Sequence, residues 1–248
     1  MDLKLDGKTT LVTGGSRGIG ASTARQLAKE GADVVVVYHQ NKRGAEAVAN
    51  DVRSLNRRAW TFPLDLTEMS SIDNLVDLVK KKLSKLDILI LCAGRSIITP
   101  FNEIDSDEWH AVMDVNLNGP FLLLKKLVPV MSKGASVVTV SSVAAHTGVP
   151  RHAHYAAAKA GLINLTKSAA RVLAPDIRVN CVAPGITRTE MGQDTIDSLS
   201  EGYADRKLLA DRFATPEEVA QSIVFLASPV AGFIHGATLD VNGGRYLR

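Results

Sequence analysis

The sequence predicts an α/β protein with a doubly wound, seven-stranded parallel sheet flanked by helices. Short apolar runs alternate along the whole chain with longer segments of helical periodicity, and runs such as the valine-rich segment 33–38 lack alternating polar residues. Both features are typical of parallel strands that are buried on both faces between helices. With 248 residues the chain can bury one sizeable core, so we expect a single domain over residues 1–248.

The expected elements follow from this alternation. Strand-like runs span residues 9–13, 33–38, 59–64, 86–91, 135–141, 177–182 and 238–241. Helical periodicity spans residues 19–30, 42–55, 68–83, 106–131 (mostly helical), 154–174 and 216–227. Segment 186–215 has poor apolar periodicity and is too long for an ordinary connection, so we expect a lid over a binding site there.

Composition excludes several classes of protein. The net charge is only +3, the charged residues are scattered, and aromatic residues make up 5% of the chain, whereas a nucleic-acid-binding protein needs a concentrated basic face. No apolar run approaches the roughly 18 residues that span a membrane, and the first residues are polar, unlike a signal peptide. The two cysteines, Cys92 and Cys181, suit a reducing compartment. We therefore expect a cytoplasmic protein with no nucleic-acid or membrane partner.

A glycine-rich segment joins the first strand to the first helix. Residues 13–20 are Thr-Gly-Gly-Ser-Arg-Gly-Ile-Gly. Glycines there allow the backbone to approach a pyrophosphate, and the helix N-terminus offers free N–H groups to the phosphates. The alternative is a simple glycine turn, but the strand–turn–helix context favours a dinucleotide site in a Rossmann fold.

The spacing of Gly14, Gly18 and Gly20 after Thr13 resembles the short-chain dehydrogenase/reductase (SDR) family. The resemblance runs from residue 8 to residue 242 and is nearest to 3-oxoacyl-[acyl-carrier-protein] reductase-like members. It implies an oxidoreductase that interconverts carbonyls and secondary alcohols with NAD(P)(H), and a homotetramer. The cofactor-binding residues that it implies are Gly14, Ser16, Arg17, Gly18, Ile19, Gly20, Tyr38, Asp65, Leu66, Ala93, Gly94, Tyr155, Lys159, Pro184, Gly185, Thr187 and Thr189.

Two of these expectations carry a qualification, those for Asp65 and for the segment with Ala93 and Gly94. Asp65 matches the family's adenine-contacting acid, but it can also be a helix cap. Thr189 matches the threonine that contacts the nicotinamide carboxamide. The family's Asn-Asn-Ala-Gly segment is Leu-Cys-Ala-Gly at 91–94, which keeps Ala93 and Gly94 but loses two polar side chains. Cys92 is expected to be an ordinary buried cysteine.

The end of the second predicted strand decides between the two nicotinamide cofactors. An acid there would bind the ribose hydroxyls of NAD and repel a 2′-phosphate, and no acid occurs at 36–43. Arg17 lies in the glycine loop, and Lys42 and Arg43 follow, although these two can equally be a solvated helix start. NADP(H) is therefore preferred, with NAD(H) as the alternative.

Tyr155 and Lys159 are four residues apart in a helical segment and so share one face. An ammonium beside a phenol favours the phenolate, so Lys159 is expected to lower the pKa of Tyr155 and make it a proton donor or acceptor. Tyr203 and Lys207 have the same spacing, but only Tyr155 follows a strand end, thirteen residues after Ser142. We assign Tyr155 and Lys159 to catalysis.

The resemblance implies two further catalytic residues. Ser142, rather than its neighbour Ser141, matches the serine that orients the substrate oxygen. Asn116, rather than Asn118, matches the asparagine that distorts its helix and helps a water reach the lysine. No metal is expected, because His146, His152 and His154 lack a recognised ligand spacing; we expect surface or rim histidines.

The substrate remains open. A 3-oxoacyl thioester is one candidate, and a carrier protein bearing it would need basic residues near the cleft, such as Lys133 or Arg151. Basic residues often found before the sixth strand are replaced here by Ala-Pro-Asp at 174–176, so another small ketone, sugar or secondary alcohol is the alternative. The apolar lid residues Met191, Ile196, Leu199, Tyr203, Leu208 and Leu209 suit a moderately hydrophobic carbonyl compound or simply pack the lid. A regulator that binds NADP(H) without turnover is disfavoured, because Ser, Tyr and Lys are all present.

Overall fold

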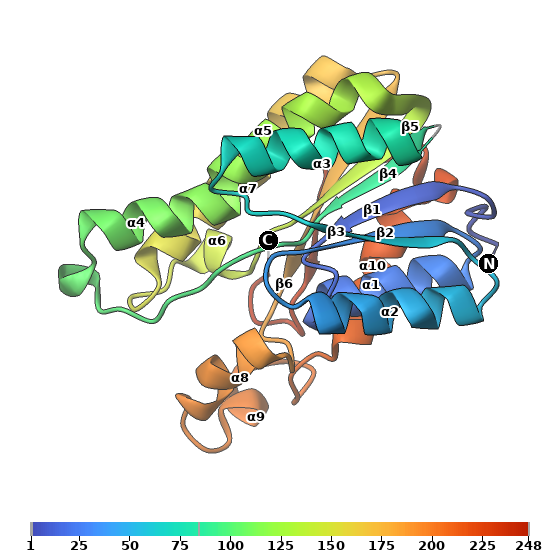
Figure 1. The fold of residues 1–248 in the computed structure, drawn as a ribbon. Coiled ribbons are helices and arrows are strands. Elements are labelled where there is room, and N and C mark those ends of the chain that lie inside the picture. The colour runs from blue at the N-terminus through green and yellow to red at the C-terminus, as the bar shows by residue number, and fades with distance from the viewer. Residues whose placement is uncertain (1, 84, 248) are drawn as a thin grey trace.

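A computed structural model describes residues 2–83 and 85–247, and a sheet of seven parallel strands forms its centre (Figure 1). The strands are β1 Thr9–Thr13, β2 Asp33–Tyr38, β3 Ala59–Pro63, β4 Leu86–Leu91, β5 Met131–Val140, β6 Ile177–Pro184 and β7 Thr238–Val241. Their order is β3-β2-β1-β4-β5-β6-β7, with every neighbouring pair parallel. The predicted doubly wound fold is confirmed.

Helices cover both faces of this sheet. They are α1 Gly18–Lys29, α2 Lys42–Ser54, α3 Met69–Lys82, α4 Ser106–Met113, α5 Gly119–Leu127, α6 Ala144–Thr147, α7 Ala153–Leu173, α8 Glu190–Asp197, α9 Tyr203–Lys207 and α10 Pro216–Ala227. Helices α1, α2 and α10 pack on one face, and α3, α5 and α7 pack on the other (Figure 1). No helix within the described residues is both long and apolar enough to cross a membrane.

The valines of β2 show why the strands lack polar alternation. Val34 and Val36 belong to the core under α1 and α2, whereas Val35 and Val37 belong to the core on the opposite face. All four side chains are almost completely buried. Each such burial contributes roughly 1.5–3 kcal/mol, so both faces of the strand must be apolar.

Segment 106–131 is mostly helical, as expected, and its helix is distorted at Asn116. It divides into α4, a π-helical turn at Asp114–Asn118, α5, and a 3₁₀ turn at Val128–Val130. Within the π turn, the Asn116 amide donates to the carbonyls of Val112 (2.8 Å) and Arg95 (2.7 Å), and these bonds draw the backbone toward β4. The distortion is therefore caused by tertiary contacts.

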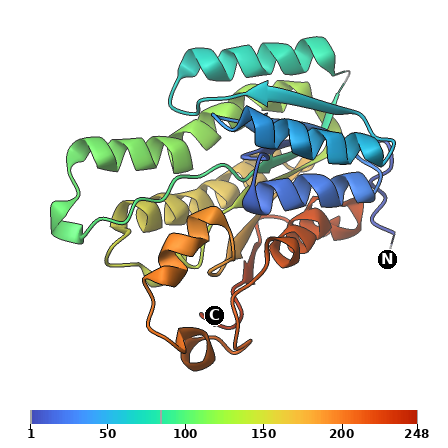
Figure 2. The same ribbon diagram turned by 60° about the horizontal axis from the view of Figure 1, so that its bottom comes forward.

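The expected lid, segment 186–215, contains the short helices α8 and α9. Thr189 caps α8 by accepting a hydrogen bond from the Gly192 N–H (3.0 Å). The two helices project from the body of the molecule below the end of β6 (Figures 1 and 2). Hydrogen bonds and an ion pair tie the segment to the rest of the chain, among them Arg245–Tyr203 and Arg17–Glu190, and its role as a lid stays a prediction.

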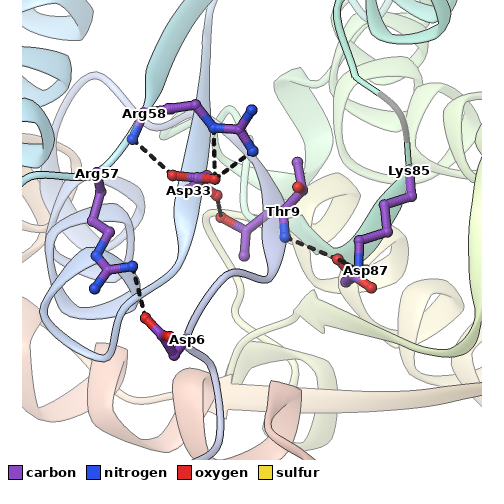
Figure 3. A network of polar contacts seen from close by, with 8 residues as sticks. Asp6, Thr9, Asp33, Arg57, Arg58, Lys85 and Asp87 are labelled. Atoms are coloured by element: carbon purple, nitrogen blue, oxygen red, sulfur yellow. Dashed lines mark hydrogen bonds and ion pairs between the residues drawn. The ribbon is translucent and has the colours of Figure 1, made fainter.

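At the amino ends of β1, β2 and β4, buried carboxylates are fully paired (Figure 3). Asp33 accepts from the Arg58 backbone N–H (2.7 Å) and from its side chain (Nε 2.9 Å, Nη2 2.8 Å). Asp87 accepts from the Thr9 N–H (2.9 Å) and pairs with Lys8 and Lys85. These bonds tie the starts of neighbouring strands together.

Candidate active site

A cavity of about 1120 Å³ opens at the carboxyl ends of the strands, where ligands bind in doubly wound sheets. Every cofactor-binding residue predicted from the sequence lines it, together with Ser142. Asn116 lies behind the wall and is completely buried. The fold thus brings the predicted residues from β1, β4, β5, α7 and β6 into one place.

The glycine loop has the backbone that its sequence requires. Gly14 and Gly18 have φ of 66° and 54°, a left-handed conformation that favours glycine. A Cβ on Gly14 would lie 2.9 Å from Ala93 Cα, and one on Gly20 would lie 2.3 Å from the Gly14 carbonyl oxygen. Larger residues would fill the space where the loop packs against β4 and α1. The N-terminus of α1 therefore opens toward the cavity and fits a pyrophosphate.

Thr13 holds this loop to the next strand. Its hydroxyl accepts the N–H groups of Cys92 (3.0 Å) and Ala93 (3.1 Å) and donates to the Ile90 carbonyl (3.3 Å). These bonds fix the Ala93–Gly94 segment at the cavity wall.

The residues that follow β2 and β3 form one end of the cavity. His39 Nε2 lies 3.2 Å from Asp65 Oδ2, and Asp65 Oδ1 accepts from the Thr67 side chain (2.7 Å) and N–H (2.9 Å). The Thr67 hydroxyl lowers the pKa of Asp65, and desolvation opposes it. Asp65 therefore lines the cavity and closes a turn with Thr67, but it does not cap the next helix, because the N-cap of α3 is Glu68. The helix-cap alternative is wrong, and the adenine contact stays a prediction.

Basic residues near this end differ in position. Arg17 lines the cavity and forms an ion pair with Glu190, the first residue of α8. Lys42 and Arg43 are exposed at the start of α2 and do not line the cavity, which agrees with a solvated helix start. The Arg17–Glu190 pair links the glycine loop to the lid, and a Cβ on Gly18 would lie 3.2 Å from Thr189 Cγ2.

Ser142, Tyr155 and Lys159 meet at the other end. Tyr155 is within hydrogen-bonding reach of Ser142, and Lys159 Nζ lies 5.6 Å from the Tyr155 ring centroid. Lys159 Nζ donates to the Val140 carbonyl (2.9 Å), which anchors it to the end of β5. The neighbouring Ser141 is buried and its hydroxyl donates to the Lys159 carbonyl (2.8 Å), so it holds α7 in place.

Burial dominates the electrostatics of these groups. It raises the pKa of Tyr155 to about 12, opposed by the hydrogen bond with Ser142 and reinforced by Cys92. It lowers the pKa of Lys159 to about 8. The net shift of the Tyr155 pKa is therefore opposite to the lowering expected from Lys159, because desolvation of the buried phenol is its largest cause. Burial likewise raises the pKa of Cys92 to about 11, as expected for an unreactive thiol.

Asn116 is next to this group without reaching the cavity. Its Oδ1 accepts from the Arg95 N–H (3.3 Å). A Cβ on Gly94 would lie 2.9 Å from Asn116 Oδ1 and 3.4 Å from Lys159 Nζ, so only glycine fits between the two side chains. Asn118, by contrast, is exposed and donates to the Asp114 side chain (2.7 Å).

The three histidines do not form a metal site, and no group of three metal-ligating side chains occurs among the described residues. His152 lines the cavity and hydrogen-bonds Ser96 Oγ (2.8 Å); burial lowers its pKa. His154 is completely buried, because its Nε2 contacts Glu108 (3.0 Å) and its Nδ1 accepts the Tyr155 N–H (3.0 Å). The expectation of a surface or rim position is therefore wrong for His154.

His146 is also largely buried. It lies 3.1 Å from Asp240 and stacks on Tyr246 at 5.2 Å between ring centroids. The segment after Ser142 is thus in contact with the residues that follow β7.

Sequence reasoning missed Arg245, which lines the cavity together with Tyr203 of the lid. Arg245 Nε donates to the Tyr203 hydroxyl (2.8 Å) across 42 residues of sequence, so no local pattern could reveal the pair. The apolar lid was only partly predicted. Met191 and Leu199 line the cavity with Tyr203, whereas Ile196, Leu208 and Leu209 do not.

Lys133, expected near the cleft, lies instead at the amino end of β5, on the far side of the sheet. There it pairs with Asp176 (3.4 Å), and the Gly134 N–H donates to the Asp176 carbonyl (2.7 Å). Its charge is neutralised at this turn, so Lys133 does not form part of a basic cleft rim.

Comparison with known proteins reveals similarity over the whole chain. A family model described as Enoyl-(Acyl carrier protein) reductase matches residues 14–245. A 3-oxoacyl-[acyl-carrier-protein] reductase FabG of Staphylococcus aureus is 38% identical over 243 residues, covering 97% of this chain and 98% of that protein. A FabG of Thermotoga maritima is 36% identical over 245 residues, covering 98% and 99%.

Solved structures agree. A short-chain dehydrogenase/reductase (glucose/ribitol dehydrogenase) from Brucella melitensis has a TM-score of 0.94 at 32% identity and 100% coverage of both chains. The chain belongs to the short-chain dehydrogenase/reductase family. It is therefore an SDR oxidoreductase of the class that acts on CH–OH and C=O groups. Another SDR structure, from Burkholderia cenocepacia in complex with NADP, has a TM-score of 0.92 at 32% identity, with 98% and 99% coverage.

Proposed function

We propose that this SDR is an NADP(H)-dependent reductase that converts a carbonyl to a secondary alcohol, and can run in reverse. The observation that carries the proposal is the single cavity in which the glycine loop and the Ser142–Tyr155–Lys159 group lie at different points of the same wall. Such a cavity can hold a dinucleotide with one end beside a proton donor.

Close packing of glycines brings the backbone to the cavity: a Cβ on Gly14 would collide with Ala93, and a Cβ on Gly94 would collide with Asn116. The glycine loop and α1 would hold the pyrophosphate, and Thr187 and Thr189 would hold the nicotinamide end. Bound NADPH supplies the hydride. Arg17 and His39, with no acid between residues 36 and 43, favour a 2′-phosphate over the bare hydroxyl of NAD.

Tyr155 donates the proton to the substrate oxygen, and Ser142 hydrogen-bonds the same oxygen. A phenol with a pKa of about 12 is protonated at neutral pH, which suits the reductive direction. Lys159 acts on Tyr155 through its charge, so its pKa of about 8 makes that effect pH-dependent near neutrality. Asn116 accepts a hydrogen bond from the Arg95 N–H and lies beside Gly94. In this position it helps a water molecule reach Lys159.

For the substrate we propose a small ketone, with a 3-oxoacyl thioester as the first candidate, since relatives named for that activity cover the whole chain. The Lys133–Asp176 pair argues against a carrier protein docked on that turn. The other basic candidate, Arg151, is exposed between Pro150 and His152, which line the cavity. Because the Lys133–Asp176 turn does not favour a carrier protein, another ketone, a sugar or a secondary alcohol is the second candidate substrate.

We also propose a cytoplasmic homotetramer in which residues 2–247 form one domain and 186–215 the lid. Exposed Trp109 on α4, Phe121 on α5 and Phe233 before β7 offer apolar surface for contacts between subunits. Light scattering of the purified chain tests the assembly, and a monomer at micromolar concentration would contradict it.

The decisive test is a rate assay that follows NADPH or NADH absorbance with a 3-oxoacyl thioester and a panel of ketones. Faster turnover with NADPH than with NADH is expected. Turnover of the thioester favours the first candidate, and turnover of only other ketones favours the second. Tight NADP binding with no turnover of any carbonyl or alcohol would contradict the proposed function and favour a regulatory role.

A further inference from the structure

Four side chains from the lid and the chain's last residues form a continuous stack. The guanidinium of Arg188 lies 5.6 Å from the Phe213 ring centroid, and Phe213 stacks on Tyr203 at 6.5 Å. The guanidinium of Arg245 lies 5.9 Å from the Tyr203 ring centroid, and its Nε donates to the Tyr203 hydroxyl (2.8 Å). Cations over aromatic rings are attracted by the ring electrons, so the stack binds the lid to the residues after β7.

The backbone around Arg245 is also fixed. Its N–H donates to the Asn242 carbonyl (3.1 Å), and the Asn242 side chain donates to the Tyr246 carbonyl (3.0 Å) and accepts from the Gly244 N–H (2.9 Å). Tyr246 stacks on His146, four residues after Ser142. Arg245 is therefore held between the lid and the segment that follows the proposed substrate-orienting serine.

This guanidinium is only partly used by the protein. Its Nε bonds Tyr203, but its two terminal nitrogens have no hydrogen-bond partner, and no carboxylate pairs with it, among residues 2–83 and 85–247. The carboxylates that line the cavity are Asp65 and Glu190, and they are paired with His39 and Arg17. A partly buried, fixed cation facing a cavity without a free acid is suited to an anionic ligand.

We propose that Arg245 binds an anionic group of the substrate, a carboxylate or a phosphate, and so determines specificity for charged carbonyl compounds. This inference rests on the proposed reductase function and narrows its substrate class. The planar fork of arginine can donate two parallel hydrogen bonds to either oxyanion. Tyr203 is a positioning residue, since it orients the fork through Nε and leaves the terminal nitrogens free.

The test compares substrates that differ only in charge. Steady-state rates with NADPH are measured for 3-oxo acids and their methyl esters, and for a 3-oxoacyl coenzyme A thioester and its N-acetylcysteamine analogue, which lacks the phosphates. The first pair detects a carboxylate site and the second a phosphate site. We expect the charged member of one pair to have the lower KM.

Arg245→Gln should raise KM for that charged member about 10- to 100-fold, with little change for its neutral partner. Arg245→Lys should recover part of the preference, and Tyr203→Phe should raise KM more than it lowers kcat. Arg188→Gln is the matched control, because it removes the cation at the other end of the same stack and does not line the cavity. It should leave the charged-to-neutral ratio unchanged.

A second readout does not need turnover. Calorimetric titration of the NADP complex with 3-hydroxybutyrate, its methyl ester and pantetheine phosphate should show anion binding that Arg245→Gln abolishes. No charge preference in either measurement, or a preference that survives Arg245→Gln, would overturn the anion site. Charge-dependent binding without turnover of any substrate would instead retain the site and defeat the proposed reductase function.

Discussion

The two ends of the sheet use buried charge in opposite ways. At the amino ends, Asp33 and Asp87 are buried, and each is surrounded by the cations and N–H groups that it needs (Figure 3). At the carboxyl ends, Lys159 is equally buried but has one carbonyl partner, and desolvation lowers its pKa to about 8. The protein itself supplies the hydrogen-bond partners of Asp33 and Asp87, whereas Lys159 keeps hydrogen-bonding capacity that a ligand can use.

This contrast separates stability from function within one sheet. Removing one partner of a buried, hydrogen-bonded carboxylate pair destabilises the fold, because the other partner is left buried without a hydrogen bond. Incompletely paired groups at the cavity reduce stability but remain available for binding and proton transfer. Substitutions at the two ends should therefore affect different properties.

The largest effect is expected from Tyr155→Phe at the carboxyl end. It removes the proposed proton donor and keeps the ring that packs near Lys159. We expect kcat to fall by about 10²- to 10⁴-fold, with NADPH affinity and thermal stability nearly unchanged. Turnover and fluorescence titration with NADPH measure the two properties, and retained turnover would remove Tyr155 from the mechanism.

Lys159→Met should abolish activity and change how the free energy of unfolding depends on pH. Because the folded pKa of about 8 lies below the ordinary value of 10.5, the folded state binds fewer protons between these values. The wild-type chain therefore gains stability relative to Lys159→Met as pH rises through this window, by about 3 kcal/mol at most. Below pH 8 the full cost of burying the charge is present.

Urea denaturation of both proteins from pH 7 to 10 measures this difference. The variant should be inactive at every pH. A difference in unfolding free energy that does not change with pH would contradict the buried, charged lysine.

Asp33→Ala tests the amino end. It leaves the Arg58 N–H without its acceptor and breaks the side-chain pair, so the free energy of unfolding should fall by about 2 kcal/mol with kcat unchanged. Asp51→Ala is the control, because its pair with Arg25 is exposed and should contribute less than about 1 kcal/mol. An equal loss of unfolding free energy in both variants, or a fall in kcat for Asp33→Ala, would contradict the proposed difference between the two ends of the sheet.

The smallest effect concerns the ion pair that joins the glycine loop to the lid. Glu190→Gln removes the partner of Arg17 and should tighten NADP binding about two- to fivefold, while NAD binding stays the same. Fluorescence titration with both dinucleotides measures the ratio. Parallel changes for the two would mean that Arg17 does not distinguish the 2′-phosphate.

The sheet was predictable because short runs rich in apolar residues, such as β2 and β4, alternate with helical segments, a pattern that local sequence contains. The glycine loop and its place before α1 were predictable for a similar reason, since backbone conformation there permits only small residues. Segment 106–131 was predictable in part, since the family resemblance placed a helix distortion at Asn116. Its form was not predictable, because the π turn includes a hydrogen bond from Asn116 to the carbonyl of Arg95, which precedes the segment in sequence. The caps of α8 and α10 were readable in the sequence at Thr189 and Thr215, so the helices in and after the lid carried a signal.

Burial of individual polar residues was harder to predict than the positions of strands. His154 and Arg245 owe their surroundings to Glu108 and Tyr203, which lie 46 and 42 residues away. The direction of the pKa shift at Tyr155 likewise depends on how much protein covers it, and spacing to Lys159 does not contain that information. The sequence therefore predicted that Ser142, Tyr155 and Lys159 lie together, and the structure supplied the burial that sets the pKa values of Tyr155 and Lys159.

The strand order has a consequence for biosynthesis. Thr13 is made near the beginning of the chain, but the N–H groups of Cys92 and Ala93 that its hydroxyl accepts follow 79 and 80 residues later. Because β1 lies between β2 and β4, a nascent chain on the ribosome can make the glycine loop long before it has the wall that the loop packs against. The glycine loop can thus take up its final packing only when β4 and the residues that follow it have left the exit tunnel.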